Sequence, residues 1–198
     1  MGAVNSASPQ SGRDLAVERV ERLSDADLAD LAEATDAAII EGGGFGWVEP
    51  QGRAALERHF RGVLLVPERE LFVARLDGHV VGSALLVRPP RNNEAQAFAA
   101  TLTHAYVAPY ARGFGLARMM VGKAEERAAA LGHRVINLDV RETQATAIAL
   151  FESLGYLHWG THPYYARVRG QTVAGHFYTK TLEPGRGRST GELIDGAA

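Results

Sequence analysis

The chain has 198 residues, of which 46% are hydrophobic, so it can bury the core of one domain but hardly of two. The formal net charge of −2 at pH 7 argues against a nucleic-acid binder, because such proteins usually carry a basic surface. The absence of cysteine excludes disulfides, thiolate catalysis and cysteine-ligated zinc, and we expect no metal site.

The ends of the chain differ in composition from its middle. Residues 1–13 are small and polar and residues 184–198 are rich in glycine, so we expect a disordered first tail, a loose last tail and one domain at 14–183. No apolar run reaches the roughly 18 residues of a membrane span, and the N-terminus lacks the pattern of a signal peptide. We therefore expect a cytoplasmic protein that does not bind membranes.

Hydrophobic spacing predicts a run of short elements in the first half of the chain. In chain order they are a strand at Leu15–Val20, a helix from about Ser24 to Ile40, a second helix opening at Pro50, and strands at Leu71–Leu76, Val80–Val87 and Phe98–Val107. Asp77-Gly78 is a strong hairpin signal between two of these strands. The segment 41–47 holds four glycines with Phe45 and Trp47. It is either a plain connection with its rings on the core or a mobile loop with flat apolar faces.

The most informative stretch is the turn Arg112-Gly113-Phe114-Gly115-Leu116-Ala117, which separates a predicted strand from a helix predicted at Leu116–Leu131. The first turn of a helix has amide N–H groups without helical partners, and the helix dipole adds positive charge there. Glycine lets the backbone come close to a bulky anion, and Arg112 and Arg118 flank the turn. A pyrophosphate would fit this turn, although an ordinary strand-to-helix connection looks similar.

The pattern continues after this helix. Gly132 is a predicted helix cap, and a strand at Val135–Val140 would run parallel to the strand before the glycine turn. A helix containing Leu150 and Phe151 follows and ends at Gly155. We expect two last strands, at Tyr156–Gly160 and Val173–Leu182, joined by a loop that holds Tyr164 and Tyr165.

This order, β-α-α-β-β-β-α-β-α-β-β, and its local motifs resemble the GNAT acyltransferase family over roughly residues 15–182. The matching motifs are Val107-Ala108-Pro109, Arg112-x-x-Gly115-x-Ala117, Leu138-Asp139, Gln144-x-x-Ala147-x-x-Leu150-Phe151 and Gly155-Tyr156. The resemblance implies an α/β (α+β) fold with a mixed, mostly antiparallel sheet of about seven strands, a central splayed parallel pair and about four flanking helices. Gly44-Phe45-Gly46-Trp47 and Pro163-Tyr164-Tyr165-Ala166 further resemble bacterial enzymes similar to the tabtoxin-resistance acetyltransferase.

The resemblance also implies a cofactor, acetyl-CoA or another acyl-CoA. Its pyrophosphate would lie on the amides of Phe114 to Arg118, and its pantetheine arm would bond to the backbone of Ala105 and Val107. Gln144 would reach the arm from the other side, or else be a solvated helix-start residue. The expected cofactor-binding residues are Ala105, Val107, Arg112, Gly113, Phe114, Gly115, Leu116, Ala117, Arg118, Gln144 and Phe151.

The catalytic groups depart from the family pattern, because Phe151 stands where many relatives have a tyrosine that protonates the leaving group. Alternation along the strand before the glycine turn puts Thr103 on the face expected to meet the substrate and His104 on the other, so His104 is expected to be structural. His162 and Tyr164 remain as catalytic candidates. The expected contacts to the acceptor, meaning the amine that receives the acyl group, are Phe45, Trp47, Thr103 and Tyr165.

The sequence is compatible with three functions. The leading one is an acyl-CoA-dependent N-acetyltransferase acting on a primary amine of a small molecule or peptide. The alternative is a non-catalytic module that senses acyl-CoA with the same fold. A Rossmann-type dinucleotide binder is disfavoured, because the glycine turn follows several strands and lacks the third glycine of that motif. We expect no nucleic-acid or membrane partner, and homodimer formation is left open.

Overall fold

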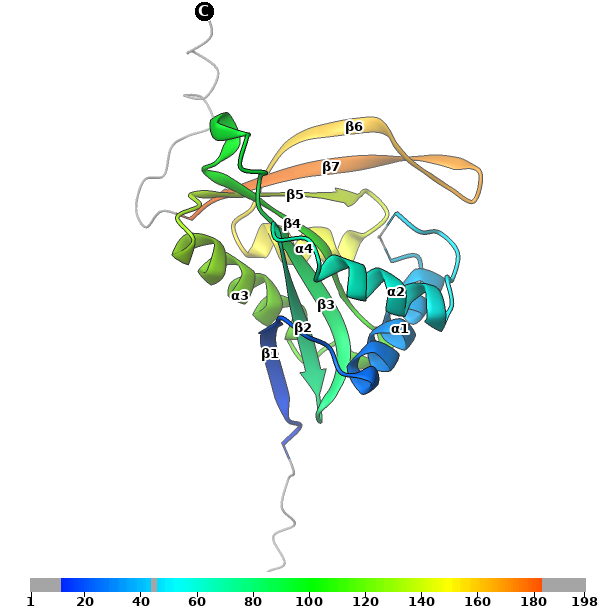
Figure 1. The fold of residues 1–198 in the computed structure, drawn as a ribbon. Coiled ribbons are helices and arrows are strands. Elements are labelled where there is room, and N and C mark those ends of the chain that lie inside the picture. The colour runs from blue at the N-terminus through cyan, green and yellow to red at the C-terminus, as the bar shows by residue number, and fades with distance from the viewer. Residues whose placement is uncertain (1–11, 44–45, 183–198) are drawn as a thin grey trace, which may run out of the picture. The chain divides into compact units, whose positions relative to one another are not determined.

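The computed structural model describes residues 12–43 and 46–182. Within these ranges it has seven strands and four α-helices, in the predicted order (Figure 1). They are β1 (Leu15–Val20), α1 (Asp25–Ile40), α2 (Arg53–Val63), β2 (Arg69–Leu76), β3 (His79–Val87), β4 (Ala99–Val107), α3 (Leu116–Ala130), β5 (Val135–Arg141), α4 (Ala145–Ser153), β6 (Leu157–Val168) and β7 (Gln171–Thr181). In the described ranges, no helix is both long and apolar enough to cross a membrane.

The strands form one mixed sheet in the order β1-β2-β3-β4-β5-β7-β6. The pairs β1–β2, β5–β7 and β6–β7 are antiparallel, whereas β4 and β5 are parallel. The predicted mixed sheet is therefore confirmed. The described chain divides into two compact units, residues 12–85 with 104–123 and residues 86–103 with 124–182.

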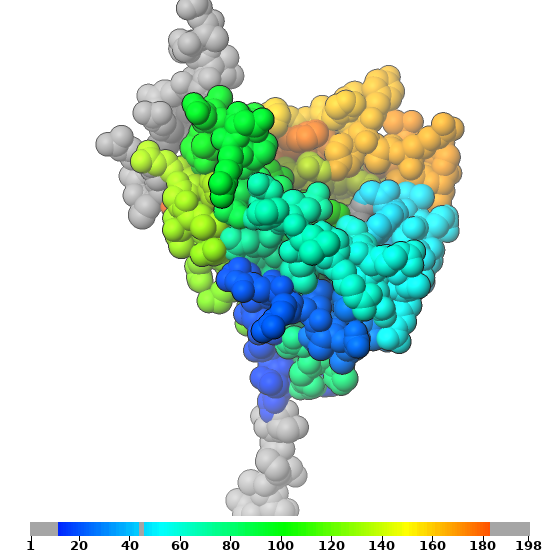
Figure 2. Space-filling model, viewed as in Figure 1, coloured from blue at the N-terminus to red at the C-terminus, as the bar shows by residue number. Residues whose placement is uncertain are grey.

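In the first unit, local signals set where the two early helices begin. Ser24 caps α1: its hydroxyl accepts from the Asp27 N–H at 3.1 Å, and the Asp27 carboxylate accepts from the Ser24 N–H at 3.2 Å. The second helix begins at Arg53 and not at Pro50. The Asp36 carboxylate in α1 accepts from the N–H groups of residues 51 and 52, at 2.9 and 3.0 Å, so a contact between segments sets this start. Figure 2 shows the residues of α1 and α2 adjoining on the visible surface.

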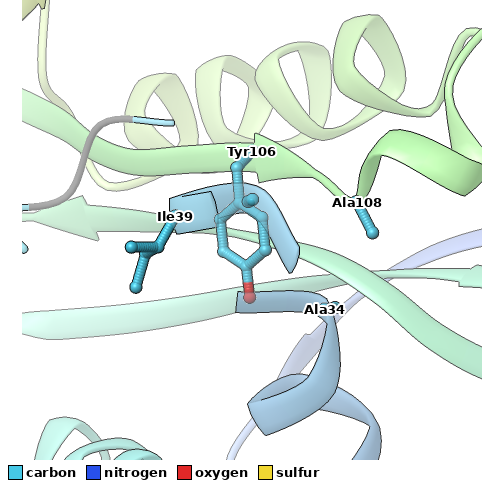
Figure 3. Close-up of a cluster of buried hydrophobic side chains, with 5 residues drawn as sticks. Ala34, Ile39, Tyr106 and Ala108 are labelled. Carbon is cyan, nitrogen blue, oxygen red and sulfur yellow. The ribbon is translucent and has the colours of Figure 1, made fainter. Parts of the chain in front are cut away.

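The end of β4 is fixed by a small buried cluster. The ring of Tyr106 lies between Ala34 and Ile39 of α1, with Ala108 beside it (Figure 3). The Tyr106 hydroxyl shares a hydrogen bond of 2.6 Å with Thr35 Oγ1, which satisfies both buried hydroxyls. Burial raises the pKa of Tyr106 to about 12, so this phenol stays protonated and structural at neutral pH.

Beside this cluster, β3 and β4 approach unusually closely. A Cβ atom on Gly82 would lie 2.4 Å from the Tyr106 carbonyl oxygen and 3.0 Å from Val107 Cα. The Ala108 N–H donates to the Val81 carbonyl at 2.8 Å. Any side chain at position 82 would therefore push the backbone of Tyr106 and Val107 away from β3.

In the second unit, β5 pairs with β7 along its whole length, from Val135↔Thr181 to Arg141↔Gly175. The parallel ladder of β4 with β5 joins three residue pairs, Ala99↔Val135 to Thr101↔Asn137. The strands β6 and β7 form a long hairpin (Figure 1) with a register shift between His162 and Ala166.

The long hairpin corrects the prediction of two short strands joined by a tyrosine-rich loop. Tyr164 and Tyr165 lie within β6, and the connection is the two-residue turn Arg169-Gly170. Both turn residues have positive φ, 47° and 82°, as a tight hairpin requires. Arginine at the first turn position is not a usual hairpin signal, which explains why the sequence did not reveal the turn.

The predicted tails lie almost wholly outside the described residues. Residue 13 is described, and Arg13 forms an ion pair of 2.6 Å with Asp77 in the β2–β3 turn. This part of the predicted first tail is therefore anchored.

Candidate active site

The glycine turn has the backbone that the sequence predicted for an anion site. Gly113 and Gly115 have φ of 89° and 80°, a region that residues with side chains resist. A Cβ atom built on either glycine meets no heavy atom within 4 Å, so the space above the turn is open. Leu116 is buried and anchors the first turn of α3, while residues 112–115 are exposed. The N–H groups of this first turn are therefore available to an anion.

Arg112 fastens the turn to its surroundings. Its Nε donates to the Val107 carbonyl at 3.3 Å, and its Nη1 forms an ion pair with Glu41 at the end of α1. Both side chains of the ion pair are about half exposed. Glu41 partly neutralises the guanidinium, so Arg112 adds less positive charge to the turn than a free arginine would. Its contacts with Glu41 and Val107 also hold the turn in place. Arg118 is exposed on α3 and Ala117 is half-buried.

The last residues of β4 present their backbone to one edge. The Ala108 N–H bonds to β3, and successive residues of a strand direct their backbone groups to opposite edges. The N–H and carbonyl groups of Ala105 and Val107 therefore face away from β3. The contact from Arg112 to the Val107 carbonyl agrees with this direction.

His104 has a backbone conformation that the sequence did not predict. Its φ is +51°, a left-handed conformation in the middle of β4. The buried residues Leu102 and Tyr106 lie two positions before and after it, in agreement with the predicted alternation. The expectation that His104 is structural stays a prediction.

The ring of His104 faces α2. Its centroid lies 6.0 Å from that of His59, and we call these two residues the histidine pair. Trp47 contacts His59 edge-on with centroids 4.9 Å apart. Both histidines are half-buried. Burial, with a smaller effect from the charge of Arg69, holds the pKa of His59 below its ordinary value, so His59 is neutral at pH 7.

Sequence reasoning missed His59. Leu56, Phe60 and Val63 are the buried residues of α2, and His59 lies three positions after the first and next to the second. Helical spacing alone could therefore have placed His59 near the inner face. Its contact with His104 could not have been found, because the contact joins two segments that lie far apart in the sequence.

The packing of Trp47 supports the first of the two alternatives for segment 41–47, a connection with its rings on the core. Its ring is half-buried against the cluster around Tyr106, and it also contacts His59. The predicted acceptor residue Phe45 lies outside the described residues. Thr103 is half-buried just before the histidine on β4.

In the second unit, three contacts position Tyr165. Its ring lies over Gly175, where a Cβ atom would come within 2.2 Å of Tyr165 Cγ. Its edge meets Phe177 with centroids 5.9 Å apart, and its hydroxyl donates to the Asp139 carboxylate on β5. Burial and this carboxylate raise the pKa of Tyr165 well above its ordinary value. Tyr165 therefore keeps its proton at neutral pH and cannot act as a base.

The two predicted catalytic residues lie on the exposed side of β6. Tyr164 is 78% exposed, and its N–H donates to His162 Nδ1 at 3.0 Å. Because Nδ1 accepts, the proton of a neutral His162 is on Nε2. Their catalytic role stays a prediction.

Two further predicted cofactor contacts belong to the second unit. Gln144 precedes α4, and its carbonyl accepts from the Ile148 N–H at 3.0 Å. Phe151 is buried, with its ring edge-on to Tyr156 at 5.6 Å. No group on Phe151 can protonate a leaving thiolate, as the sequence already indicated.

The fold and the glycine turn are those of an acyl-CoA-dependent acetyltransferase. A family model described as the acetyltransferase (GNAT) family matches residues 35–156. An N-acetyltransferase from the hisH-hisA intergenic region of Azospirillum brasilense is 60% identical over 131 residues, which are 66% of this chain and 78% of the relative. The chain therefore belongs to the GNAT acetyltransferase family.

Two solved structures show the same fold. An N-acetyltransferase from Staphylococcus aureus has a TM-score of 0.73 and 20% identity, and the match covers 86% of this chain and 99% of that one. A phosphinothricin acetyltransferase from Sinorhizobium meliloti, solved with acetyl-CoA, has a TM-score of 0.71 and 22% identity, with 88% and 92% covered. The membership of the GNAT family predicted from the motifs is thus confirmed.

Proposed function

We propose that this protein transfers the acetyl group of acetyl-CoA to a primary amine of a small molecule or peptide. The observation that carries the proposal is the turn at Gly113 and Gly115, where two left-handed glycines and open space precede the N-terminus of a 15-residue helix. The orphan N–H groups of that helix and its dipole favour a bound pyrophosphate.

The end of β4 supports the rest of the cofactor site. The backbone groups of Ala105 and Val107 face away from β3 and suit the amides of an extended pantetheine arm. The Val107 carbonyl already accepts from Arg112, so we assign its N–H to the arm. Acetyl-CoA supplies the acetyl group as a thioester, and the chain supplies orientation and proton transfer.

The proton balance of the reaction defines what the protein must do. An ammonium cannot attack a carbonyl, so the acceptor must lose a proton before its nitrogen bonds to the acetyl carbon. The carbon–sulfur bond then breaks, and the products are the amide, CoA thiol and a released proton. Since Phe151 offers no proton, we assign protonation of the thiolate to solvent.

For the acceptor, we keep the predicted contacts and give the support for each. Trp47 offers a half-exposed flat ring, suited to an apolar acceptor body. The Asp139 carboxylate, to which the Tyr165 hydroxyl donates, could accept hydrogen bonds from the ammonium group of the amine. Thr103 and Phe45 are kept on the sequence argument alone.

The test is an amine panel assayed for release of free thiol from acetyl-CoA. The panel holds amino acids, polyamines, a peptide with a free N-terminus, and phosphinothricin, the last because a protein of the same fold is named for it. Amine-dependent thiol release above that of acetyl-CoA alone would support the proposal. Binding of acetyl-CoA by calorimetry without turnover on any amine would favour the sensing module instead.

A further inference from the structure

Phe177 of β7 is the centre of a small group of aromatic rings in the second unit. Its ring contacts that of Trp159, with centroids 5.6 Å apart, and that of Tyr165, with centroids 5.9 Å apart. We call these three residues the aromatic cluster. Tyr165 and Phe177 are half-buried, whereas Trp159 is 63% exposed. A large exposed ring that a neighbouring ring holds in place is well suited to stack on a ligand.

The aromatic cluster results from two irregularities in β6, which is the last strand at one edge of the sheet (Figure 1). The register of its pairing with β7 shifts twice, between His158 and Gly160 and between His162 and Ala166. Trp159 lies in the first shift and Tyr165 in the second, and both rings contact Phe177. Bulges of this kind turn side chains in new directions and are frequent beside functional sites. Two separate bulges that direct rings to one residue therefore favour a binding role.

The cluster lies on the face of the sheet that points away from α3 and α4. The residues of β7 on the other face contact these helices: the Tyr178 hydroxyl donates to a glutamate of α4 at 3.0 Å, and the Lys180 ammonium donates to a glutamate of α3 at 2.6 Å. Because side chains alternate along a strand, Phe177 points to the opposite face. Its directly paired residue on β5 is Asp139, so that side chain lies on the same face as the cluster.

Asp139 gives this face a negative charge next to the rings. The residue is exposed, and its carboxylate accepts from the Tyr165 hydroxyl. A carboxylate has about four acceptor positions, so capacity for a ligand remains. The parallel ladder of β4 with β5 ends at Thr101↔Asn137, and Asp139 is the next residue of β5 on that face. The carboxylate therefore lies beyond the last residue pair of this ladder.

The charges on this face suit a cation better than an anion. Arg141 follows Asp139 on the same face of β5, but it is only 7% exposed. A ligand carboxylate would meet the charge of Asp139, and Arg141 is too buried to offset that repulsion by direct contact. An ammonium group would instead be attracted both by Asp139 and by the negative faces of the aromatic rings.

We propose that the aromatic cluster and Asp139 select an acceptor whose ammonium group is joined to a flat aromatic body and has no carboxylate beside it. The inference rests on the proposed N-acetyl transfer and names the class of its acceptor. The ammonium group pairs with Asp139, and the aromatic body stacks on Phe177 and Trp159. The bond changes are those of the proposed transfer, in which the nitrogen loses a proton, bonds to the acetyl carbon and displaces CoA.

The first experiment compares three amines on the wild-type protein with acetyl-CoA. They are phenethylamine, cyclohexylethylamine, which has the same carbon skeleton without a flat ring, and phenylalanine, which adds a carboxylate beside the nitrogen. We expect kcat/KM for phenethylamine to exceed that for each of the other two by about tenfold or more. Equal values for the three, or a preference for phenylalanine, would overturn the proposal.

The second experiment compares Trp159→Ala and Asp139→Asn with Phe98→Ala, a control at an aromatic residue that is 52% exposed and lies outside the cluster. Trp159→Ala should lower kcat/KM about tenfold for phenethylamine and leave that for ethylamine nearly unchanged, because ethylamine has no ring to stack. Asp139→Asn should lower kcat/KM for both amines, because it removes the charge and keeps an oxygen for the Tyr165 hydroxyl. Phe98→Ala should change neither value. Equal losses for both amines in Trp159→Ala, or wild-type values in Asp139→Asn, would contradict the proposal.

A binding measurement separates failure of this inference from failure of the proposed function. Calorimetry with CoA in place of acetyl-CoA gives the Kd of phenethylamine without turnover. Trp159 and Asp139 are exposed, so both variants should keep the wild-type melting temperature, and the Kd should rise in both but not in Phe98→Ala. If the wild-type protein acetylates no amine, the proposed function fails, whereas binding that is lost in Trp159→Ala would still support the site. Absence of binding to the wild-type protein would overturn it.

Discussion

Replacing Gly115 with glutamate tests the cofactor site directly. The added carboxylate would stand in the open space above the turn, where no heavy atom lies within 4 Å of the new Cβ. A pyrophosphate bound to the same turn would meet this negative charge. At about 5 Å and an effective dielectric constant near 20, each pair of like charges costs about 3 kcal/mol.

The site is exposed, so solvent and salt reduce this cost. A remaining penalty of about 1.4 kcal/mol or more weakens binding at least tenfold. We therefore expect the Kd for acetyl-CoA, measured by calorimetry, to rise at least tenfold in Gly115→Glu. The effect should grow as the salt concentration falls.

Backbone strain must be separated from charge, because φ at Gly115 is +80°. A side chain in this region costs roughly 1–2 kcal/mol of stability, whatever its chemistry. Gly132, after the other end of α3, is a matched control with φ of +88° and open space at its Cβ. Gly132→Glu should lose comparable stability in urea and keep the wild-type Kd. An unchanged Kd in folded Gly115→Glu, or an equal change in both variants, would refute the assignment of the phosphate site.

Three further predictions follow from close contacts. Gly82→Ala should lower the free energy of unfolding, measured in urea, by about 2 kcal/mol or more, because the new Cβ would overlap the backbone of β4. The control is Gly62→Ala in α2, where the Cβ meets open space, and it should be neutral or stabilising. Gly175→Ala should displace the Tyr165 ring and lower the melting temperature, and a wild-type melting curve would contradict the ring position. Phe151→Tyr should keep or raise turnover at some loss of stability, since the ring is buried; a tenfold fall in kcat with the cofactor Kd intact would mean that the position is misread.

The sequence predicted the fold well where the signals are local. The order of elements followed from hydrophobic spacing, from Asp77-Gly78 and from the glycines that end helices, and it is confirmed. The errors arose where contacts between distant segments, or a turn without a typical sequence, set the ends of an element. Asp36 sets the start of α2, and the unmarked turn Arg169-Gly170 lets β6 and β7 run on as one hairpin.

The candidate site divides in the same way. The glycine turn was predictable because Gly113 and Gly115 have positive φ, a conformation that glycine adopts far more readily than other residues. The histidine pair was not predictable, because its contact joins two segments that lie far apart in the sequence. The left-handed conformation of His104 likewise leaves no trace in the pattern of apolar residues.

What maintains the strain at His104 is the structure that follows it. The Tyr106 hydroxyl is bonded to Thr35 within a buried cluster, and the Ala108 N–H is bonded to β3. Because Gly82 has no side chain, the backbone of Tyr106 and Val107 can lie against β3. These contacts fix the end of β4 in one place, so His104 cannot relax without breaking a buried hydrogen bond or a close strand contact. The cluster in Figure 3 therefore fixes the end of β4, the strand that carries His104 and leads into the glycine turn.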